Sequence, residues 1–402
     1  MRKVFIITSI ILWVCVAVFI SGIFITGMSG GLQNMFKEKL LTRQEFPANE
    51  IQNIEVEGTH HSIEILKTDG ENINVSQYGS INTKQEDFFK HTITQDSMNA
   101  GDTLRIYVEK RIRIVVSFDF RTKLKIEIPE NINGDLRIKT SSGGIKIGDE
   151  SMPKADNLSF KFANLNLRTS SGGIKLNERI GANSLYAQTS SGGIRTCAVL
   201  NIADNLELDS SSGGIRLEEN IAGGSLRAET SSGGIHAYAG LNIAKELELN
   251  TSSGGIKTEG RVTAGSLLAK TSSGGIKLDE TAVQTFELQS SSGGVRAESL
   301  SGGGSVKTSS GGINIALTEP KGDLNFSARS GGIKLYLDPN AQFTLDASTT
   351  SGSIRTDFAA KFESKNKVFA EIGENPVASI TAGATSGGIS VETKDELKNK
   401  NR

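Results

Sequence analysis

The sequence predicts an all-β protein: a parallel β-helix, or β-solenoid, with coils of about 20 residues, preceded by one N-terminal transmembrane helix. A Ser-Gly-Gly-Ile motif or a close variant recurs twelve times, and residues 4–27 carry no charge. Glycine is abundant, with 45 of 402 residues, and proline is rare, with 6, which excludes collagen and proline-rich disorder. The balance of 44 basic against 45 acidic side chains argues against a nucleic-acid partner.

The uncharged segment 4–27 is long enough to cross a membrane. At about 1.5 Å per residue, a helix of this length reaches roughly 36 Å, against a hydrocarbon core of about 30 Å. Arg2 and Lys3 precede it and favour a cytoplasmic N-terminus at residues 1–3. The sequence therefore predicts a single-pass protein of the cell membrane whose C-terminal solenoid is extracytoplasmic. A cleaved signal peptide is the alternative, although its apolar region normally spans only about 7–15 residues.

Two segments separate the predicted anchor from the repeats. Residues 28–50 are predicted to form a linker or stalk. Residues 51–130 alternate apolar and polar side chains, as in Ile63-Glu64-Ile65, which is typical of half-buried strands. Because the open end of a solenoid exposes unpaired backbone groups, we expect this region to form a β cap.

The motifs occupy residues 131–392 and are followed by a charged tail, residues 393–402. Inner motifs follow one another at 18 to 21 residues, 20 on average, whereas the first and last steps are 29 and 35 residues. The long steps predict insertions near residues 150–162 and 357–378. We expect each period to be one coil, stacked on the next at about 4.8 Å. The first glycines of the motifs, the predicted structural corners, are Gly143, Gly172, Gly192, Gly213, Gly233, Gly254, Gly274, Gly293, Gly311, Gly331, Gly352 and Gly387.

Alignment of the motifs on the first glycine separates inward from outward positions. The positions seven and five residues before it are apolar in nearly every copy, the position three before it is usually threonine, and the position two after it is isoleucine or valine. The inward positions alternate along a strand and change phase across the two glycines. This change indicates a corner, where we expect glycine because the backbone needs φ > 0 or a bulge.

Three positions after the first glycine, an outward residue is Lys or Arg in nine of the twelve copies. This basic ladder consists of Lys146, Lys175, Arg195, Arg216, Lys257, Lys277, Arg296, Lys334 and Arg355. Stacked at about 4.8 Å, it could hold an anionic polymer such as a teichoic acid, lipopolysaccharide or acidic glycan. The simpler interpretation is that the charges prevent lateral aggregation of the sheet. A parallel acidic column would partly neutralise them, and it consists of Glu218, Glu259, Asp279, Glu298, Asp357 and Glu392.

No catalytic, cofactor or metal site is predicted. Cys15 and Cys197 are the two cysteines and give no zinc or redox spacing, and His60 and His61 would point to opposite faces of a strand. Calcium-binding glycine-rich β-rolls need aspartate after the glycines, where this chain has Ile and a basic residue. A glycan-cleaving β-helix enzyme is a weaker alternative, because the acidic residues recur as a column rather than as one pair.

Two stretches carry a resemblance to a known family. Leu-Lys-Ile-Glu-Ile-Pro at 124–129 and Leu-Arg-Ile-Lys-Thr-Ser-Ser-Gly-Gly-Ile-Lys-Ile at 136–147 resemble the bacterial DUF4097 family, and the similarity covers roughly residues 50–392. The family is named for adhesins and is related to proteins with head GIN domains. The resemblance implies a β-helical fold and an adhesin-like role, with a link of some members to envelope-stress operons, and it supplies no catalytic residues.

The residues and the resemblance together predict a non-enzymatic, membrane-anchored binding surface for envelope polymers or other cell surfaces. The alternative is a structural or regulatory envelope-stress protein that contacts membrane-protein partners. No cofactor is expected. The expected partners are the membrane, through residues 4–27, and an anionic polysaccharide, cell-wall polymer or envelope protein.

The inward and outward assignments predict different outcomes for two neighbouring substitutions. Ile256→Asp places an unpaired charge inside the stack, so we expect the free energy of unfolding to fall by several kcal/mol. Lys257→Ser changes an outward side chain and should leave the melting temperature nearly unchanged. Thermal melting followed by circular dichroism measures both, and equal melting temperatures would contradict the inward assignment of Ile256.

Overall fold

The computed structural model describes residues 39–79, 88–96, 101–108, 122–149 and 159–394. The predicted transmembrane segment lies outside these residues, together with residues 28–38 of the predicted linker and residues 395–402 of the charged tail. The rest of the linker is not a stalk throughout, because Lys39–Pro47 form strand β1. Within the described part of the chain, no helix is long and apolar enough to cross a membrane.

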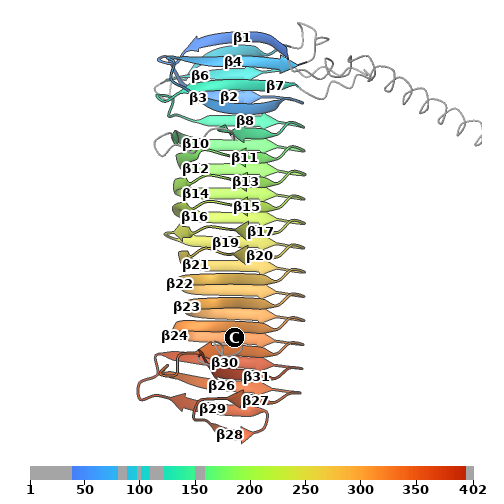
Figure 1. The fold of residues 1–402 in the computed structure, drawn as a ribbon, viewed down its shortest axis with the longest axis vertical. Coiled ribbons are helices and arrows are strands. Elements are labelled where there is room, and N and C mark those ends of the chain that lie inside the picture. The colour runs from blue at the N-terminus through green and yellow to red at the C-terminus, as the bar shows by residue number, and fades with distance from the viewer. Residues whose placement is uncertain (1–38, 80–87, 97–100, 109–121, 150–158, 395–402) are drawn as a thin grey trace, which may run out of the picture.

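The described residues form one continuous stack of β-strands, which confirms the all-β repeat architecture (Figure 1). Most repeat coils contain a longer strand, a Ser-Gly-Gly corner, a short strand and a second turn. In three coils, the short strand continues directly into the next longer strand. The corners form the row of loops on the right of Figure 1. The first half of the repeat strands are β8 (Leu136–Thr140), β9 (Ile145–Ile147), β10 (Ser159–Thr169), β11 (Ile174–Leu176), β12 (Arg179–Thr189), β13 (Ile194–Thr196), β14 (Leu200–Ser210), β15 (Ile215–Leu217) and β16 (Ile221–Thr230). They continue with β17 (Ile235–Ala237), β18 (Leu241–Ile243), β19 (Glu246–Thr251), β20 (Ile256–Thr258), β21 (Val262–Thr271), β22 (Ile276–Ser290), β23 (Val295–Thr308), β24 (Ile313–Ala328) and β25 (Ile333–Leu337).

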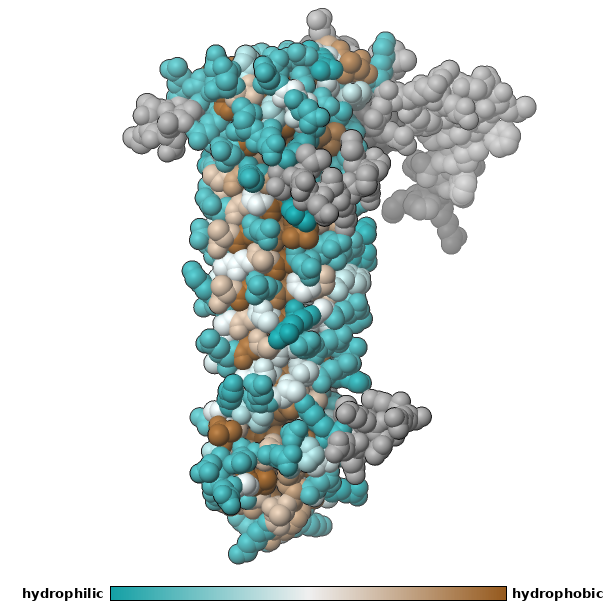
Figure 2. All heavy atoms as spheres, turned by 60° about the vertical axis from the view of Figure 1, so that its left-hand side comes forward, coloured by the Kyte–Doolittle hydropathy of each residue, from teal (hydrophilic) through white to brown (hydrophobic). Residues whose placement is uncertain are grey.

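Equivalent residues of successive coils lie side by side in parallel pairs. Leu185 of β12 is in register with Leu206 of β14, and Ile194 of β13 with Ile215 of β15. These side chains are at most 1% exposed, so the columns of Leu and Ile form one continuous core. Hydrophilic residues cover most of the face in Figure 2, where a broken column of hydrophobic residues runs along the stack.

The corner glycines are required by close stacking and not by a left-handed backbone. None of the twelve first glycines, all of which are described, has a positive φ. Of the two alternatives expected at the corner, φ > 0 or a bulge, the first is therefore wrong. A Cβ on Gly254 would instead lie 2.1 Å from the carbonyl oxygen of Gly233 in the preceding coil, and a Cβ on Gly274 would lie 2.0 Å from that of Gly254. Only a residue without a side chain permits this approach.

The inward threonines hold the corners together. The Thr251 hydroxyl donates a hydrogen bond to the carbonyl oxygen of Gly233, at 2.7 Å, and accepts one from the backbone N–H of Gly254, at 3.1 Å. Thr230 and Thr271 make the same pair of bonds in the neighbouring coils. The threonine column therefore supplies partners to corner groups that are turned away from the β-ladders.

At the N-terminal end, the order of coils in space differs from their order in the chain. β2 lies between β6 and β8, and Ile54 is in register with both Leu104 and Leu136. β3 likewise lies between β7 and β9. Antiparallel strands end the parallel stack, since β4 pairs with β7, β1 with β4, and β5 with β6. These strands are β1 (Lys39–Pro47), β2 (Ile51–Glu57), β3 (Ser62–Thr68), β4 (Asn72–Gly79), β5 (Lys90–Asp96), β6 (Gly101–Tyr107) and β7 (Lys123–Pro129).

The C-terminal end shows the same exchange. β30 lies between β24 and β26, with Ile380 in register with both Leu324 and Leu345, and β31 lies between β25 and β27. The coil of β30 and β31 comes last in the chain. In space it lies between the coil of β24 and β25 and the coil of β26 and β27. The prediction that the coils stack in the order of the chain is therefore wrong at this end. Beyond β26, the antiparallel strand β29 pairs with β26, and β28 pairs with β29. These strands are β26 (Phe343–Thr349), β27 (Ile354–Thr356), β28 (Lys361–Ser364), β29 (Lys367–Ile372), β30 (Ala378–Ala384) and β31 (Ile389–Thr393).

The stacking geometry predicts that the two glycines of one corner tolerate alanine differently. Gly254→Ala would force backbones of neighbouring coils apart, and we expect a loss of about 2–4 kcal/mol in the free energy of unfolding. In Gly255→Ala the new Cβ would lie 3.2 Å from the nearest backbone oxygen, so the loss should be no more than about 1 kcal/mol. Denaturant unfolding measures both, and a larger loss for Gly255→Ala would refute this explanation of the corner.

The threonine column gives a second stability prediction. Thr251→Val keeps the shape of the side chain and removes its hydroxyl, which leaves the Gly233 carbonyl without that partner, so we expect a loss of about 1–3 kcal/mol. The exposed neighbour Ser252 provides the control, because Ser252→Ala should have little effect. Indistinguishable unfolding midpoints for the two variants would contradict the proposed role of the hydroxyl.

Candidate binding groove along the short strands

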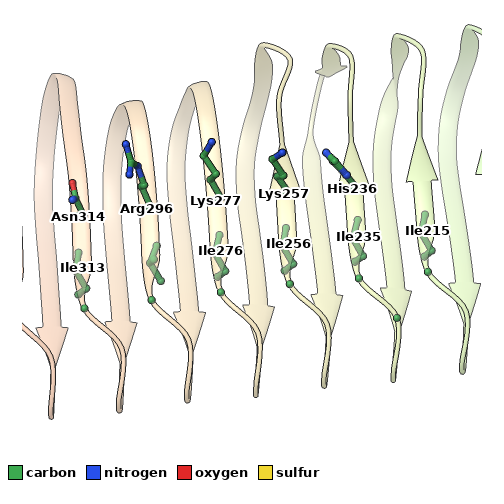
Figure 3. A pocket seen from close by; sticks show the side chains of 18 of the residues that line it. Ile215, Ile235, His236, Ile256, Lys257, Ile276, Lys277, Arg296, Ile313 and Asn314 are labelled. Carbon is green, nitrogen blue, oxygen red and sulfur yellow. The ribbon is translucent and has the colours of Figure 1, made fainter. Parts of the chain in front are cut away.

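The short strands place all nine residues of the basic ladder in one column. Parallel pairing puts Lys175 beside Lys146 and Arg195, and Lys277 beside Lys257 and Arg296. Figure 3 shows the side chains of His236, Lys257, Lys277, Arg296 and Asn314 in one row across successive coils. In space the column runs Lys146, Lys175, Arg195, Arg216, His236, Lys257, Lys277, Arg296, Asn314, Lys334, Ser390 and Arg355.

The exchanged coils at the C-terminal end change one part of this column. Lys334 and Arg355 are successive basic residues in the chain, but Ser390 of the inserted coil lies between them. Arg355 is therefore separated from the rest of the basic ladder by one uncharged rung. Asn314 and His236 interrupt the run of Lys and Arg at two further rungs.

An open groove follows the column. One section has a volume of about 1040 Å³ and the next about 690 Å³, and they share Gly214 and Arg216, so they join end to end. The residues that line the larger section include five of the nine ladder residues and no carboxylate. Glu64 is the carboxylate that lines the smaller section. The described surface of the groove is therefore positively charged along most of its length.

The second glycines of ten motifs, from Gly144 to Gly332, form part of the groove wall. Gly255 and Gly275 lie in neighbouring coils, and their lack of side chains leaves the backbone accessible from the groove. The carbonyl of Gly275 already accepts a hydrogen bond from the N–H of Ile256, at 2.9 Å. Because this backbone is satisfied within the sheet, recognition of a ligand falls mainly on the side chains of the column.

The acidic column lies beside the basic ladder and pairs with part of it. Arg195 donates two hydrogen bonds to Glu218, at 2.6 and 2.9 Å, and these hold the pKa of the Glu218 carboxyl below its usual value. Lys277 lies 3.6 Å from Asp279 and 3.5 Å from Glu298. Such exposed pairs contribute little to stability, but they fix the side chains along one edge of the groove.

Pairing is uneven along the ladder. At one end, Glu64 contacts both Lys123 and Lys146. Burial raises the pKa of Glu64, but the bonds from the two lysines outweigh it and the net pKa is lowered. In contrast, within the described residues Arg216, Lys334 and Arg355 form no ion pair. The groove thus presents some cationic side chains that form no ion pair with a described carboxylate.

A pair of aromatic side chains, His236 and Tyr238, interrupts the charges and was not predicted from the sequence. The rings of His236 and Tyr238 are stacked with centroids 3.6 Å apart, and both residues line the groove. The signal was available in the sequence, because residues two apart on a strand share a face. Glu259, from the next coil, lies 3.0 Å from Nε2 of His236.

The described residues offer no group of three or more His, Cys, Asp or Glu side chains that could hold a metal ion. Cys197 is a free, partly buried thiol, and burial raises its pKa. His60 and His61 do not share one site, since His60 contacts the exposed Ser142 and His61 is buried against Gln77.

Comparisons with solved structures show low similarity. A putative cell adhesion protein from Clostridium sporogenes is 10% identical and covers 89% of this chain and 100% of its own, with a TM-score of 0.26. A putative adhesin from Bacteroides fragilis is 12% identical over 88% and 97% of the two chains, with a TM-score of 0.23. Another from Parabacteroides merdae is 12% identical over 74% and 96%, with a TM-score of 0.33. These TM-scores are too low to support an inference about this chain.

Comparison with protein families gives a clear result. No curated protein matches the chain. The model of one family, described as Toastrack DUF4097, matches residues 51–259 and 225–392. The two matches overlap and together cover the cap, the repeats and the exchanged C-terminal coil, and the chain therefore belongs to the DUF4097 (Toastrack) family.

Proposed function

We propose that this protein is a non-enzymatic, adhesin-like binding protein whose groove holds an extended anionic polymer of a cell envelope. The observation that carries the proposal is the alignment of the basic ladder along one open groove, whose larger section has no carboxylate in its lining. A linear polyanion can contact several rungs at once. Many weak contacts along one chain then add to a useful affinity, although each exposed charge contributes little.

The geometry favours a polymer over a compact anion. The cationic side chains follow one another at the spacing of parallel strands, about 4.8 Å, and they do not converge on a point. A small anion would contact one or two of them, with the rest of the groove empty. A negatively charged chain lying parallel to the stack axis would meet Arg216, Lys257, Lys277 and Arg296 in turn. It would bind Arg216 directly and compete with the acidic column for the other three.

The uncharged segment 4–27 supports a location for this activity. As a transmembrane helix with residues 1–3 in the cytoplasm, it would place the solenoid outside the cell membrane, where teichoic acids, lipopolysaccharide or acidic glycans occur. In this proposal, a single-pass anchor and a stalk hold the stack outside the membrane, so that the groove lies within the envelope.

One observation favours a second candidate, contact with a protein partner in a structural or envelope-stress role. The C-terminal end exposes Phe362, Phe369 and Val377, at 47, 52 and 66%. Exposed apolar side chains at the end of a stack are suited to contact with another protein. This surface lies on and beside the β28–β29 hairpin, so its function can be tested separately from that of the groove.

The groove proposal predicts a loss of binding when its central charges are removed. The full chain in a neutral detergent is titrated with inorganic polyphosphate and with polygalacturonate at low salt. We expect the triple variant Lys257→Ser, Lys277→Ser, Arg296→Ser to bind at least about tenfold more weakly, and the remaining binding to depend less on salt. Unchanged affinity in this variant would refute the groove.

A matched control removes three lysines elsewhere. Lys361, Lys365 and Lys367 are exposed on or beside the end hairpin, and their replacement by serine changes the net charge by the same amount. We expect this variant to bind within about twofold of the unaltered protein, because none of the three lysines lines the groove. Equal weakening of the two triple variants would show that net charge, rather than the groove, determines binding.

A further inference from the structure

The coil that contains His236 differs from its neighbours at two positions that face the same way. In the coil of Lys257, the two outward positions after the corner hold Lys257 and Glu259, an ion pair. In the preceding coil the same positions hold His236 and Tyr238. A cation and an anion are thus replaced by two aromatic rings, in the larger section of the groove.

The two rings form an ordered platform. Their planes are inclined by 28° with centroids 3.6 Å apart, and Nε2 of His236 is held by Glu259 at 3.0 Å. Tyr238 nevertheless remains 41% exposed. Between residues 136 and 349, it is the one large apolar or aromatic side chain that the described part of the chain leaves exposed. An exposed ring held by its neighbours binds a flat apolar partner at little entropic cost.

The surroundings of the platform define the chemistry of its ligand. Arg216 lies one rung before His236, and Lys257 lies one rung after it. At the position of Tyr238, the same two rungs carry Glu218 and Glu259. A ligand that fits must therefore present an apolar face to Tyr238 and place its negative groups over the neighbouring column, where Arg216 and Lys257 lie. A pyranose ring has such a face of C–H groups, and an acidic polysaccharide carries its charges at regular intervals along the chain.

We infer that Tyr238, supported by His236, is a sugar-binding subsite within the groove, and that the polymer is an acidic polysaccharide. This inference rests on the proposed function and makes its ligand class specific. One pyranose unit of an extended polysaccharide spans a distance similar to one rung of the stack, about 4.8 Å. Successive acidic sugars can thus follow successive rungs while one ring lies on Tyr238. Polyphosphate has no apolar face and gains nothing from an aromatic ring.

The test compares two polyanions on the full chain in a neutral detergent. Polygalacturonate is a chain of acidic pyranoses, and inorganic polyphosphate has the charge without the rings. We expect Tyr238→Ala to weaken polygalacturonate binding about fivefold to tenfold, as the loss of one stacked ring should. Binding of polyphosphate should stay within about twofold. Tyr238→Phe keeps the ring and should retain the affinity for polygalacturonate.

Each other outcome has a defined meaning. If Tyr238→Ala weakens both polymers equally, or neither, while the groove triple variant loses both, the sugar subsite is refuted and the polyanion groove stands. If Tyr238→Phe is as weak as Tyr238→Ala, stacking is not the source of the affinity and the inference also fails. If the unaltered protein binds neither polymer, the proposed function itself fails. Thermal melting of each variant confirms that the stack is intact.

Discussion

Backbone contact between corner glycines is the constraint on which the rest of this structure depends. Each first glycine lies so close to the backbone of a neighbouring coil that a single methyl group would not fit, and a Cβ on Gly274 would lie only 2.0 Å from the carbonyl oxygen of Gly254. Every coil must therefore turn at the same place. Because the corners coincide, the isoleucines that follow them stack into the core and the residues next to the isoleucines stack outside it. The basic ladder is thus a geometric consequence of the corner.

Features that repeat locally could be predicted from the sequence. The period of 20 residues, the inward columns of Leu, Ile and Thr, and the outward ladder all follow from the spacing of one motif and from strand alternation. The order of the end coils could not be predicted, because Ile380 fits equally well beside Leu324 and beside Leu345, and pairs with both. The cause of the glycine requirement was also hidden, since the contact joins residues of different coils.

The charges of the groove combine two effects that the sequence alone could not separate. Arg195 is committed to Glu218 by two hydrogen bonds, whereas Arg216, the next rung, forms no ion pair within the described residues. Neutralisation by the acidic column therefore applies at some rungs and not at others. The carboxylates hold some cations in place and limit the attraction of the surface for polyanions in general, so an anionic ligand must compete with them at the paired rungs. The stacked pair of His236 and Tyr238 occurs in one coil only. The consensus of the repeats has charged residues at these positions and does not show the aromatic pair.

The exchanged coils at the two ends have a consequence for how such a protein changes length. A coil added in the chain next to β2 and β3, or next to β30 and β31, would have no open strand edge to join there, because each of these coils is enclosed between two others. Duplication or deletion of whole coils in the interior keeps every contact at both ends. The stack can therefore gain or lose coils only in its interior, and the groove changes length with it. The number of interior coils thus determines the distance between the two closed ends.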